Sequence, residues 1–433
     1  MNFCPKCGAK VEGQNFCHQC GQNLTNYQAE SNNSFDFASL QMEAEKQLIE
    51  QIGLEVQNGV LVKYTGKSRS VVIPRGITEI YDGAFENNEA LMSVEVGEDV
   101  TIIGKRAFKG CKYLKEVKLP NSIIEIYDEA FYDCWALEKI NLPNKLEVIR
   151  MRTFYGCRSI KSLNIPASLK TIEYYAFASA KVERIDVEKI EDWLLFEAKD
   201  SSSIPIAPIY VNGVLLTELV IPTSVSKIKN LAFYDCQSLK KVIIPDHVKT
   251  IERSEFASCK NLETIYLPSN LASIPDYCFT RCESLVSITI PNSVQMIGEG
   301  AFSECKKLCN INLPNNLKDI KPYTFESCES LESIVIPSMT LNIMKYAFYK
   351  CINLTNIRFN ECLEGIYDNA FRLCPKLAEI SLPKSVRGIH YMAFDSTLKR
   401  ARIPAHLGEG KRRSENNINA YYMLPTTTEL IEF

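Results

Sequence analysis

The sequence has little that would place the protein in a membrane or on a polyanion. No run approaches 18 apolar residues, so we expect no membrane-spanning helix. The first residues, MNFCPKCGAK, lack the apolar core of about 7–15 residues that a signal peptide needs, which predicts a cytoplasmic location. The net charge is only −3 over 433 residues, so the composition gives no electrostatic argument for binding nucleic acid or an anionic membrane.

The sequence is also poor in catalytic signatures. It has four histidines, and none accompanies a Ser or Cys and a carboxylate in a known motif. It has no phosphate-binding P-loop and no GxGxxG following an expected strand. We therefore predict that the protein is not an enzyme and has no catalytic or cofactor-binding residues of the usual kinds.

What the chain does contain is a pattern that recurs every 23 residues. An isoleucine stands five residues before each anchor phenylalanine, and a cysteine stands three residues after it in ten of the thirteen units. Several ladders kept in register over this length indicate a repeat protein, in which each unit packs on the next. The anchors are Phe85, Phe108, Phe131, Phe154, Phe177, Phe233, Phe256, Phe279, Phe302, Phe325, Phe348, Phe371 and Phe394.

Each unit contains three kinds of local pattern. The segment LxxIxIP alternates apolar residues and predicts a short strand, which the proline ends. The stretch around Ile149 illustrates a second, shorter strand, and AFxxC predicts a short helical turn. One unit cannot bury both of its faces alone, whereas stacked units can. The fold class is therefore an α/β repeat solenoid of short parallel strands with short helical turns.

The pattern divides the chain into four parts. We predict a zinc ribbon over residues 1–24, a linker and capping helix over 25–53, the solenoid over 54–404 and a C-terminal cap over 405–433. The solenoid has about thirteen regular units, with an irregular insertion near 183–221.

Two hairpins and one helix are expected outside the regular units. Asn58-Gly59 and Asn212-Gly213 each separate two apolar runs, which is a strong signal for a two-residue hairpin. Residues 188–198 suggest an inserted helix. We interpret the insertion as a re-start within one solenoid, because the strand pattern resumes directly after it.

The first 24 residues contain two CxxC pairs separated by nine residues. Cys4, Cys7, Cys17 and Cys20 supply four thiolates, the ligand set that zinc prefers in a tetrahedral site. The segment resembles the short zinc ribbons at the N-termini of many bacterial proteins. We predict one structural zinc ion, because so small a segment has no other means of folding. The alternative is a pair of reduced or disulfide-linked turns.

The cysteine ladder within the repeats has two interpretations. Disulfides between neighbouring units are geometrically conceivable, since stacked strands lie about 4.8 Å apart. We favour reduced cysteines that act as small buried residues, because the sequence shows no export signal.

The repeat IPxSVxxIxxxAFxxCxxLxxI resembles the BspA-type, or Treponema pallidum-type, leucine-rich repeat. One unit carries it in Ile290-Pro291-Asn292-Ser293-Val294, Ala301-Phe302, Cys305 and Leu308, and the resemblance covers about residues 54–404. It implies a curved solenoid and a role in adhesion or protein binding, often at the surface of host-associated bacteria. The missing export signal and the N-terminal ribbon depart from that surface role.

The positions that do not repeat are where a partner is expected. One residue of each LxxIxIP strand should face outward. Most of these residues are polar, but Val220, Ile243, Tyr266 and Thr289 form a more apolar run. Exposed adjacent apolar side chains often mark an interaction site, although cross-strand packing without a partner explains them equally well.

We therefore predict a non-enzymatic scaffold that binds another protein, with the zinc ribbon as an accessory docking or stabilising module. One alternative is a surface adhesin exported by an unrecognised route, which cell fractionation would detect. The other is a nucleic-acid-associated regulator acting through the ribbon, which its lack of a basic patch disfavours.

Overall fold

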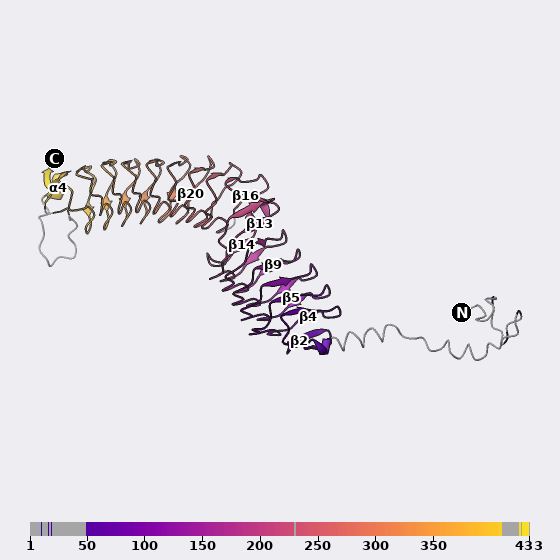
Figure 1. Ribbon diagram of the computed structural model, residues 1–433. Helices are drawn as coiled ribbons and strands as arrows, with labels where there is room; N and C mark the ends of the chain where they lie inside the picture. The colour runs from indigo at the N-terminus through magenta and orange to yellow at the C-terminus, as the bar shows by residue number, and fades with distance from the viewer. Residues whose placement is uncertain are drawn as a thin grey trace. The chain divides into compact units, whose positions relative to one another are not determined.

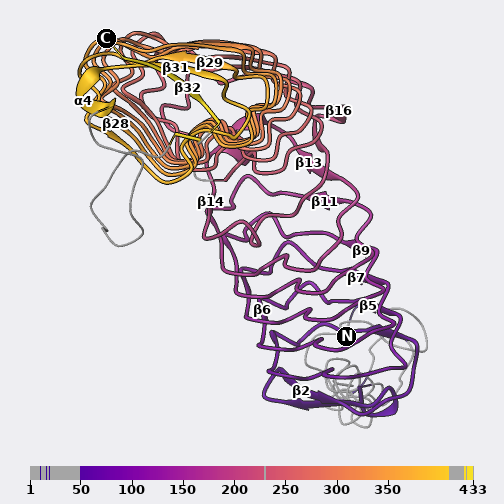
Figure 2. The same cartoon turned by 90° about the vertical axis from the view of Figure 1, so that its left-hand side faces the viewer.

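The computed structural model describes residues 10, 16, 19, 49–228, 231–408, 424–425 and 427–432. The chain divides into two compact units, 1–54 and 55–433, and the second contains the repeats. It is a solenoid whose coils stack one on the next, as the successive turns of Figures 1 and 2 show. Among the described residues, no helix has the length and apolarity to cross a bilayer.

One row of parallel strands is formed by the LxxIxIP segments. Neighbours pair 23 residues apart, as in Leu219↔Val242 and Val242↔Ile265. The row comprises β3 (Ser70–Val72), β5 (Ser93–Glu95), β7 (Glu116–Lys118), β9 (Lys139–Ile140), β11 (Leu163–Asn164), β13 (Ile185–Val187), β15 (Ile209–Val211), β17 (Glu218–Val220), β18 (Lys241–Ile243), β19 (Thr264–Tyr266), β21 (Ser287–Thr289), β23 (Asn310–Asn312), β25 (Ser333–Val335), β27 (Asn356–Arg358), β29 (Glu379–Ser381), β31 (Arg400–Ile403) and β32 (Glu429–Glu432).

A second row of mostly shorter strands ends on the repeat isoleucine in most units. The predicted strand around Ile149 is confirmed as β10, which pairs with β12 in parallel. The row comprises β2 (Val60–Tyr64), β4 (Glu79–Ile80), β6 (Ile102–Ile103), β8 (Glu125–Ile126), β10 (Val148–Ile149), β12 (Thr171–Ile172), β14 (Glu197–Ala198), β20 (Ser273–Ile274), β22 (Met296–Ile297), β24 (Asp319–Ile320), β26 (Asn342–Ile343), β28 (Gly365–Ile366) and β30 (Gly388–Ile389).

The helical turn predicted for AFxxC is wrong, because these residues form consecutive β-turns. In one unit Ala107, Lys109 and Cys111 donate their N–H groups back within the turn, while Phe108 and Gly110 donate to the next coil. A helix needs all of these donors for itself. The residues two before and two after the phenylalanine have positive φ, here Arg106 at 57° and Gly110 at 71°, as type II turns require.

The anchor phenylalanines stack along the interior of the solenoid. Neighbouring ring centroids lie between 4.8 Å, for Phe85–Phe108, and 5.9 Å, for Phe256–Phe279. The rings are nearly parallel, and all thirteen are buried. Aromatic contacts at such distances add to the free energy gained from burial. The repeated phenylalanine is therefore the centre of the core.

The insertion joins the two stacks of rings. Its helix α3 (Ile190–Leu194) is shorter than predicted, because residues 197–198 form β14 and continue the second strand row by pairing with β12. Trp193 and Phe196 are buried and meet edge-on at 4.9 Å. Trp193 Nε1 donates a hydrogen bond of 2.6 Å to the carbonyl of Ala232, in the first unit after the insertion.

Hairpins and short end elements complete the solenoid. The Asn212-Gly213 hairpin is confirmed, with β15 antiparallel to β16 (Val214–Leu215). Asn58-Gly59 lies between β1 (Leu54–Gln57) and β2, which are neighbours in one sheet. At the other end, α4 (Ala405–Gly408) precedes β32, which pairs with β31. Most of the capping helix predicted before residue 53 lies outside the described residues.

All ten ladder cysteines are free and buried. In nine of them Sγ donates to the carbonyl of the phenylalanine in the preceding coil, as Cys305 does to Phe279 at 3.1 Å. Cys236, in the first unit after the insertion, instead lies 3.7 Å from the Ser238 hydroxyl. The ladder therefore links coils through S–H groups and forms no disulfide.

These contacts predict very unequal reactivity of the thiols. Burial raises the pKa of Cys111 to about 12 and the pKa of Cys134 and Cys328 well above the ordinary value, so the reactive thiolate is scarce. Among the described cysteines, we expect iodoacetamide to modify the exposed Cys362 first and the half-buried Cys309 next. Peptide mapping by mass spectrometry measures this, with unfolded chain as the control. Fast modification of any ladder cysteine in folded chain would contradict the packing.

Candidate functional site

The strands place the predicted apolar run on one continuous face. Val220, Ile243 and Tyr266 are register partners on β17, β18 and β19, and Thr289 takes the equivalent place on β21. The exposed fractions of Val220 and Tyr266 are 57% and 55%, Ile243 is half-buried and Thr289 is exposed. The four side chains therefore form part of an exposed surface, which we call the strand face.

Strand alternation is what aims these side chains outward. The middle residue of each strand, such as Val242 or Ile265, is buried in the core, so the residues on either side of it must point to the opposite face. The strand face thus carries two residues from each coil, for example Thr264 and Tyr266. Only their identities vary from coil to coil, because the buried residue is always aliphatic.

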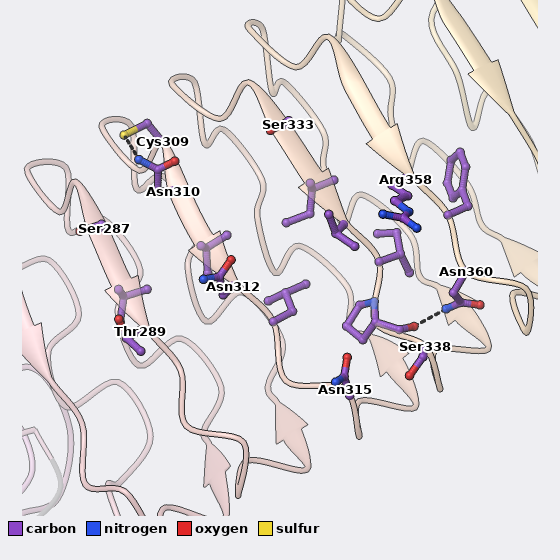
Figure 3. Close-up of a pocket in the computed structure, with 18 of the residues that line it drawn as sticks. Ser287, Thr289, Cys309, Asn310, Asn312, Asn315, Ser333, Ser338, Arg358 and Asn360 are labelled. Carbon is purple, nitrogen blue, oxygen red and sulfur yellow. Dashed lines mark hydrogen bonds between the residues drawn. The ribbon is translucent and has the colours of Figure 1, made fainter.

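The strand face is hollowed over β21, β23, β25 and β27. The groove has a volume of about 1100 Å³, and Figure 3 shows Thr289, Asn312 and Arg358 on successive parts of its floor. Its lining combines aliphatic residues and Phe359 with two charged residues, Arg358 and Glu361, and with polar uncharged ones: Ser287, Thr289, Asn310, Asn312, Asn315, Ser333, Ser338 and Asn360. Sequence reasoning placed Asn312, Val335 and Arg358 outward but gave no sign of a groove.

A fixed turn forms one end of the groove. The amide of Asn360 donates to the carbonyls of Pro337 and Thr340, and its Oδ1 accepts from the N–H of Cys362 at 2.7 Å. The two bonds of the Asn360 amide tie the turn after β27 to the coil before it, and the third closes the turn itself. Figure 3 shows the bond to Pro337. Asn360 stands where most units have proline, and this departure from the repeat could have indicated an unusual turn.

Charges on the neighbouring parts of the strand face are paired between coils. Lys241 Nζ lies 3.1 Å from Glu218, on the strand before it, and Arg400 lies 3.0 Å from Glu379. Between these two pairs, the strands of this row, β19, β21, β23, β25 and β27, carry one charged residue, Arg358. The centre of the face is therefore nearly neutral, and its charged borders are already satisfied.

The units before the insertion, from Phe85 to Phe177, form the first array, and those from Phe233 to Phe394 form the second. In the first array, charged residues of the turns around the phenylalanines are used differently. Glu129 is 9% exposed and receives Lys109 Nζ at 2.6 Å and Arg106 Nε at 3.1 Å, with Arg152 at 3.6 Å. Burial alone would raise the pKa of Glu129, but the Lys109 hydrogen bond and the nearby cations lower it below its usual range. These cations neutralise a carboxylate of the adjacent coil, so they stabilise stacking.

The described histidines have structural contacts. His247 Nε2 lies 2.9 Å from the carbonyl of Pro222, and His406 Nε2 lies 2.8 Å from that of Val386. The ring of His390 stacks on Tyr367 at 4.3 Å. None of the residues that contact these histidines was predicted to be catalytic.

The predicted zinc ligands cannot be placed in the fold. Cys4, Cys7, Cys17 and Cys20 lie outside the described residues. Within the described ranges, no group of three or more His, Cys, Asp or Glu residues is suited to hold a metal ion. The zinc site stays a prediction from the spacing of the cysteines.

Comparisons with solved structures found several bacterial repeat proteins. A leucine-rich repeat protein from Bacteroides ovatus is 24% identical, with 86% of this chain and 87% of that chain covered and a TM-score of 0.48. One from Eubacterium ventriosum is 22% identical, with 85% and 94% covered and a TM-score of 0.49. A comparison with curated proteins found no match.

A family model covers most of the chain. The model for the BspA type leucine-rich repeat region matches residues 63–194, 209–332 and 272–401. Together these ranges include all thirteen stacked phenylalanines and most strands of both rows, and they leave out the end segments and part of the insertion. The chain therefore belongs to the BspA-type leucine-rich repeat family.

Proposed function

We propose that the protein is a non-enzymatic scaffold that binds another protein through the strand face of its second array. The observation that supports this is the exposed run Val220, Ile243 and Tyr266, which continues into the groove. An aromatic and two aliphatic side chains on a rigid sheet provide apolar area that a partner can bury. The buried residues of the coils determine the fold, so the residues of the strand face can vary from coil to coil.

A double substitution tests the proposal. Ile243→Asp with Tyr266→Asp places two carboxylates in the run, and we expect loss of the partners captured from the native host by tagged wild-type chain. The matched control is Ile352→Asp with Tyr391→Asp. Tyr391 is 51% exposed and Ile352 is 40% exposed, and both lie in turns away from the strand face.

Quantitative mass spectrometry of the captured proteins gives the result. Both variants must retain the circular dichroism of the wild type, because the substituted side chains are at least partly exposed. An unchanged set of partners for the strand-face variant would overturn the proposal. Equal losses in both variants would do the same, since the effect would then be independent of the face.

We further propose that residues 1–24 bind one zinc ion through Cys4, Cys7, Cys17 and Cys20. The support is the paired CxxC spacing, which suits tetrahedral thiolate coordination. Purified, reduced protein should contain about one zinc per chain by elemental analysis, and Cys7→Ser should lose most of it. Cys309→Ser, which changes a thiol in the repeats, is the control. A wild-type chain without zinc would disprove the ribbon.

A further inference from the structure

We propose that the occupant of the groove is an extended peptide segment that bears an acidic side chain, held by Arg358. The segment would cross the strands from the apolar run to β27. This inference rests on the proposed function, because it names the chemistry of a partner for the same strand face. It is argued from charge, from hydrogen-bonding capacity and from the spacing of the coils.

Arg358 is a charged group of the strand face without an ion-pair partner among the described residues. Its side chain is exposed and makes no ion pair or side-chain hydrogen bond with any described residue. Lys241 and Arg400, on the strand face at either side, each pair with a glutamate. A guanidinium presents a planar set of donors that fits a carboxylate. Glu361, in the turn after β27, is the other charged residue of the lining.

The amides of the groove are also available to a ligand. In the first array Asn141 occupies the outward strand position and uses its Oδ1 and Nδ2 on the N–H and carbonyl of Leu119, at 3.0 and 2.7 Å. Asn312 has the equivalent position on β23, and neither its side chain nor that of Asn315, also in the lining, bonds to any described residue. Free amides offer both donors and acceptors, which the backbone of an extended peptide needs.

Apolar contacts favour a peptide over a neutral sugar. Val335 is 60% exposed and is the register partner of Arg358 on the adjacent strand. Tyr266 and Ile243 extend this apolar surface beyond the other end of the groove. A ligand that matches both features has aliphatic or aromatic groups together with one carboxylate. Amino-acid side chains supply that combination.

The coil spacing sets the length of the segment. Tyr266 and Arg358 are separated by four steps of the strand row, from β19 to β27, and strands lie about 4.8 Å apart, so the span is about 19 Å. An extended chain advances about 3.3 Å per residue. The acidic residue should therefore follow or precede the apolar anchor by about six residues.

A random 12-residue peptide display library, selected on the immobilised full chain, tests the proposal. Recovered peptides should carry Asp or Glu about six residues from an aromatic or aliphatic residue. By fluorescence anisotropy, a labelled recovered peptide should bind Arg358→Gln about tenfold more weakly than wild type, since a charge-assisted bond is lost. Lys376→Gln, an equal change of charge in an exposed turn, should bind like wild type.

Reversing the charge at position 358 provides the decisive experiment. Arg358→Glu should reject the acidic peptide and accept the same peptide with lysine in place of its acid. Peptides that lose binding with Tyr266→Asp but not with Arg358→Gln would overturn this inference and leave the proposed function standing. Peptides indifferent to both variants would count against both. Arg358-dependent binding on an oligosaccharide array, without peptide binding, would overturn the peptide assignment in favour of a sugar.

Discussion

Phe302→Ala should lower the free energy of unfolding of the second array by about 3–5 kcal/mol. Phe302 is completely buried, and its ring centroid lies 5.5 Å from that of Phe279 and 5.6 Å from that of Phe325. The substitution removes the contacts on both sides and leaves a cavity whose walls belong to three coils. Those walls are held by hydrogen bonds between coils, so they have little freedom to collapse.

Chemical denaturation followed by circular dichroism measures this loss. Because stacked repeats unfold by nearest-neighbour coupling, the data should be fitted with a model of coupled units instead of a single two-state transition. Tyr113→Ala, which truncates an aromatic that is 57% exposed, is the control and should change stability by less than about 0.5 kcal/mol. A loss below about 1 kcal/mol for Phe302→Ala would contradict a tightly packed stack.

The 23-residue period was enough to predict the stack and both strand rows. A residue that recurs at one place in every coil must meet its copies, so identical side chains at that place are buried together. The period also predicted that the ladder cysteines are buried together. These features depend only on which positions repeat, and the sequence states that directly.

The turns could not be predicted from the same residues. Alanine, lysine and glutamate favour helix, and the unit around Ala107 contains such residues. The structure instead places Arg106 at φ 57°, a conformation that costs an L-residue about 1–2 kcal/mol. Hydrogen bonds to the next coil offset that cost, as when Phe108 donates to Ala130 at 2.8 Å. Contacts with the unit 23 residues away therefore outweighed the local helix propensity. Gly110 was the residue of this turn that indicated a positive φ.

The groove could not be predicted from the sequence for a different reason. Sequence alternation gives the direction of Asn312 and Arg358, but a hollow depends on how far the turn after β27 rises beside them. That height is set by the bonds of Asn360, a residue that departs from the repeat. The candidate site was thus predicted as a set of outward side chains, and its depth and its unpaired charge came from the structure.

Glu255→Ala should stabilise the protein, against the usual direction of core substitutions. Glu255 stands where Ala232 stands in the coil before it, and its exposed fraction is 0%. Neither carboxyl oxygen has a hydrogen-bond partner among the described residues. Burying an unsatisfied polar group costs about 1–3 kcal/mol, and alanine fits this position in other coils. We expect a gain of about that size at neutral pH, measured by denaturation.

The gain should depend on pH. Burial raises the pKa of Glu255 well above its ordinary value, and the nearby amides of Phe233, Leu231 and Ala232 lower it by less. The folded chain therefore keeps a proton that the unfolded chain releases above about pH 4.3. The contribution of this group to stability is complete below that pH and falls as the pH rises towards the folded-state pKa.

Comparison of wild type with Glu255→Gln across about pH 4–9 isolates the contribution of Glu255 ionisation to the free energy of unfolding. Glutamine has nearly the same shape and cannot ionise. Relative to the Gln variant, wild type should lose stability as the pH rises, and the advantage of Glu255→Ala over wild type should grow in parallel. A difference between wild type and Glu255→Gln that stays constant with pH would show that the carboxyl is ionised in the folded chain, with a cation or water as its partner.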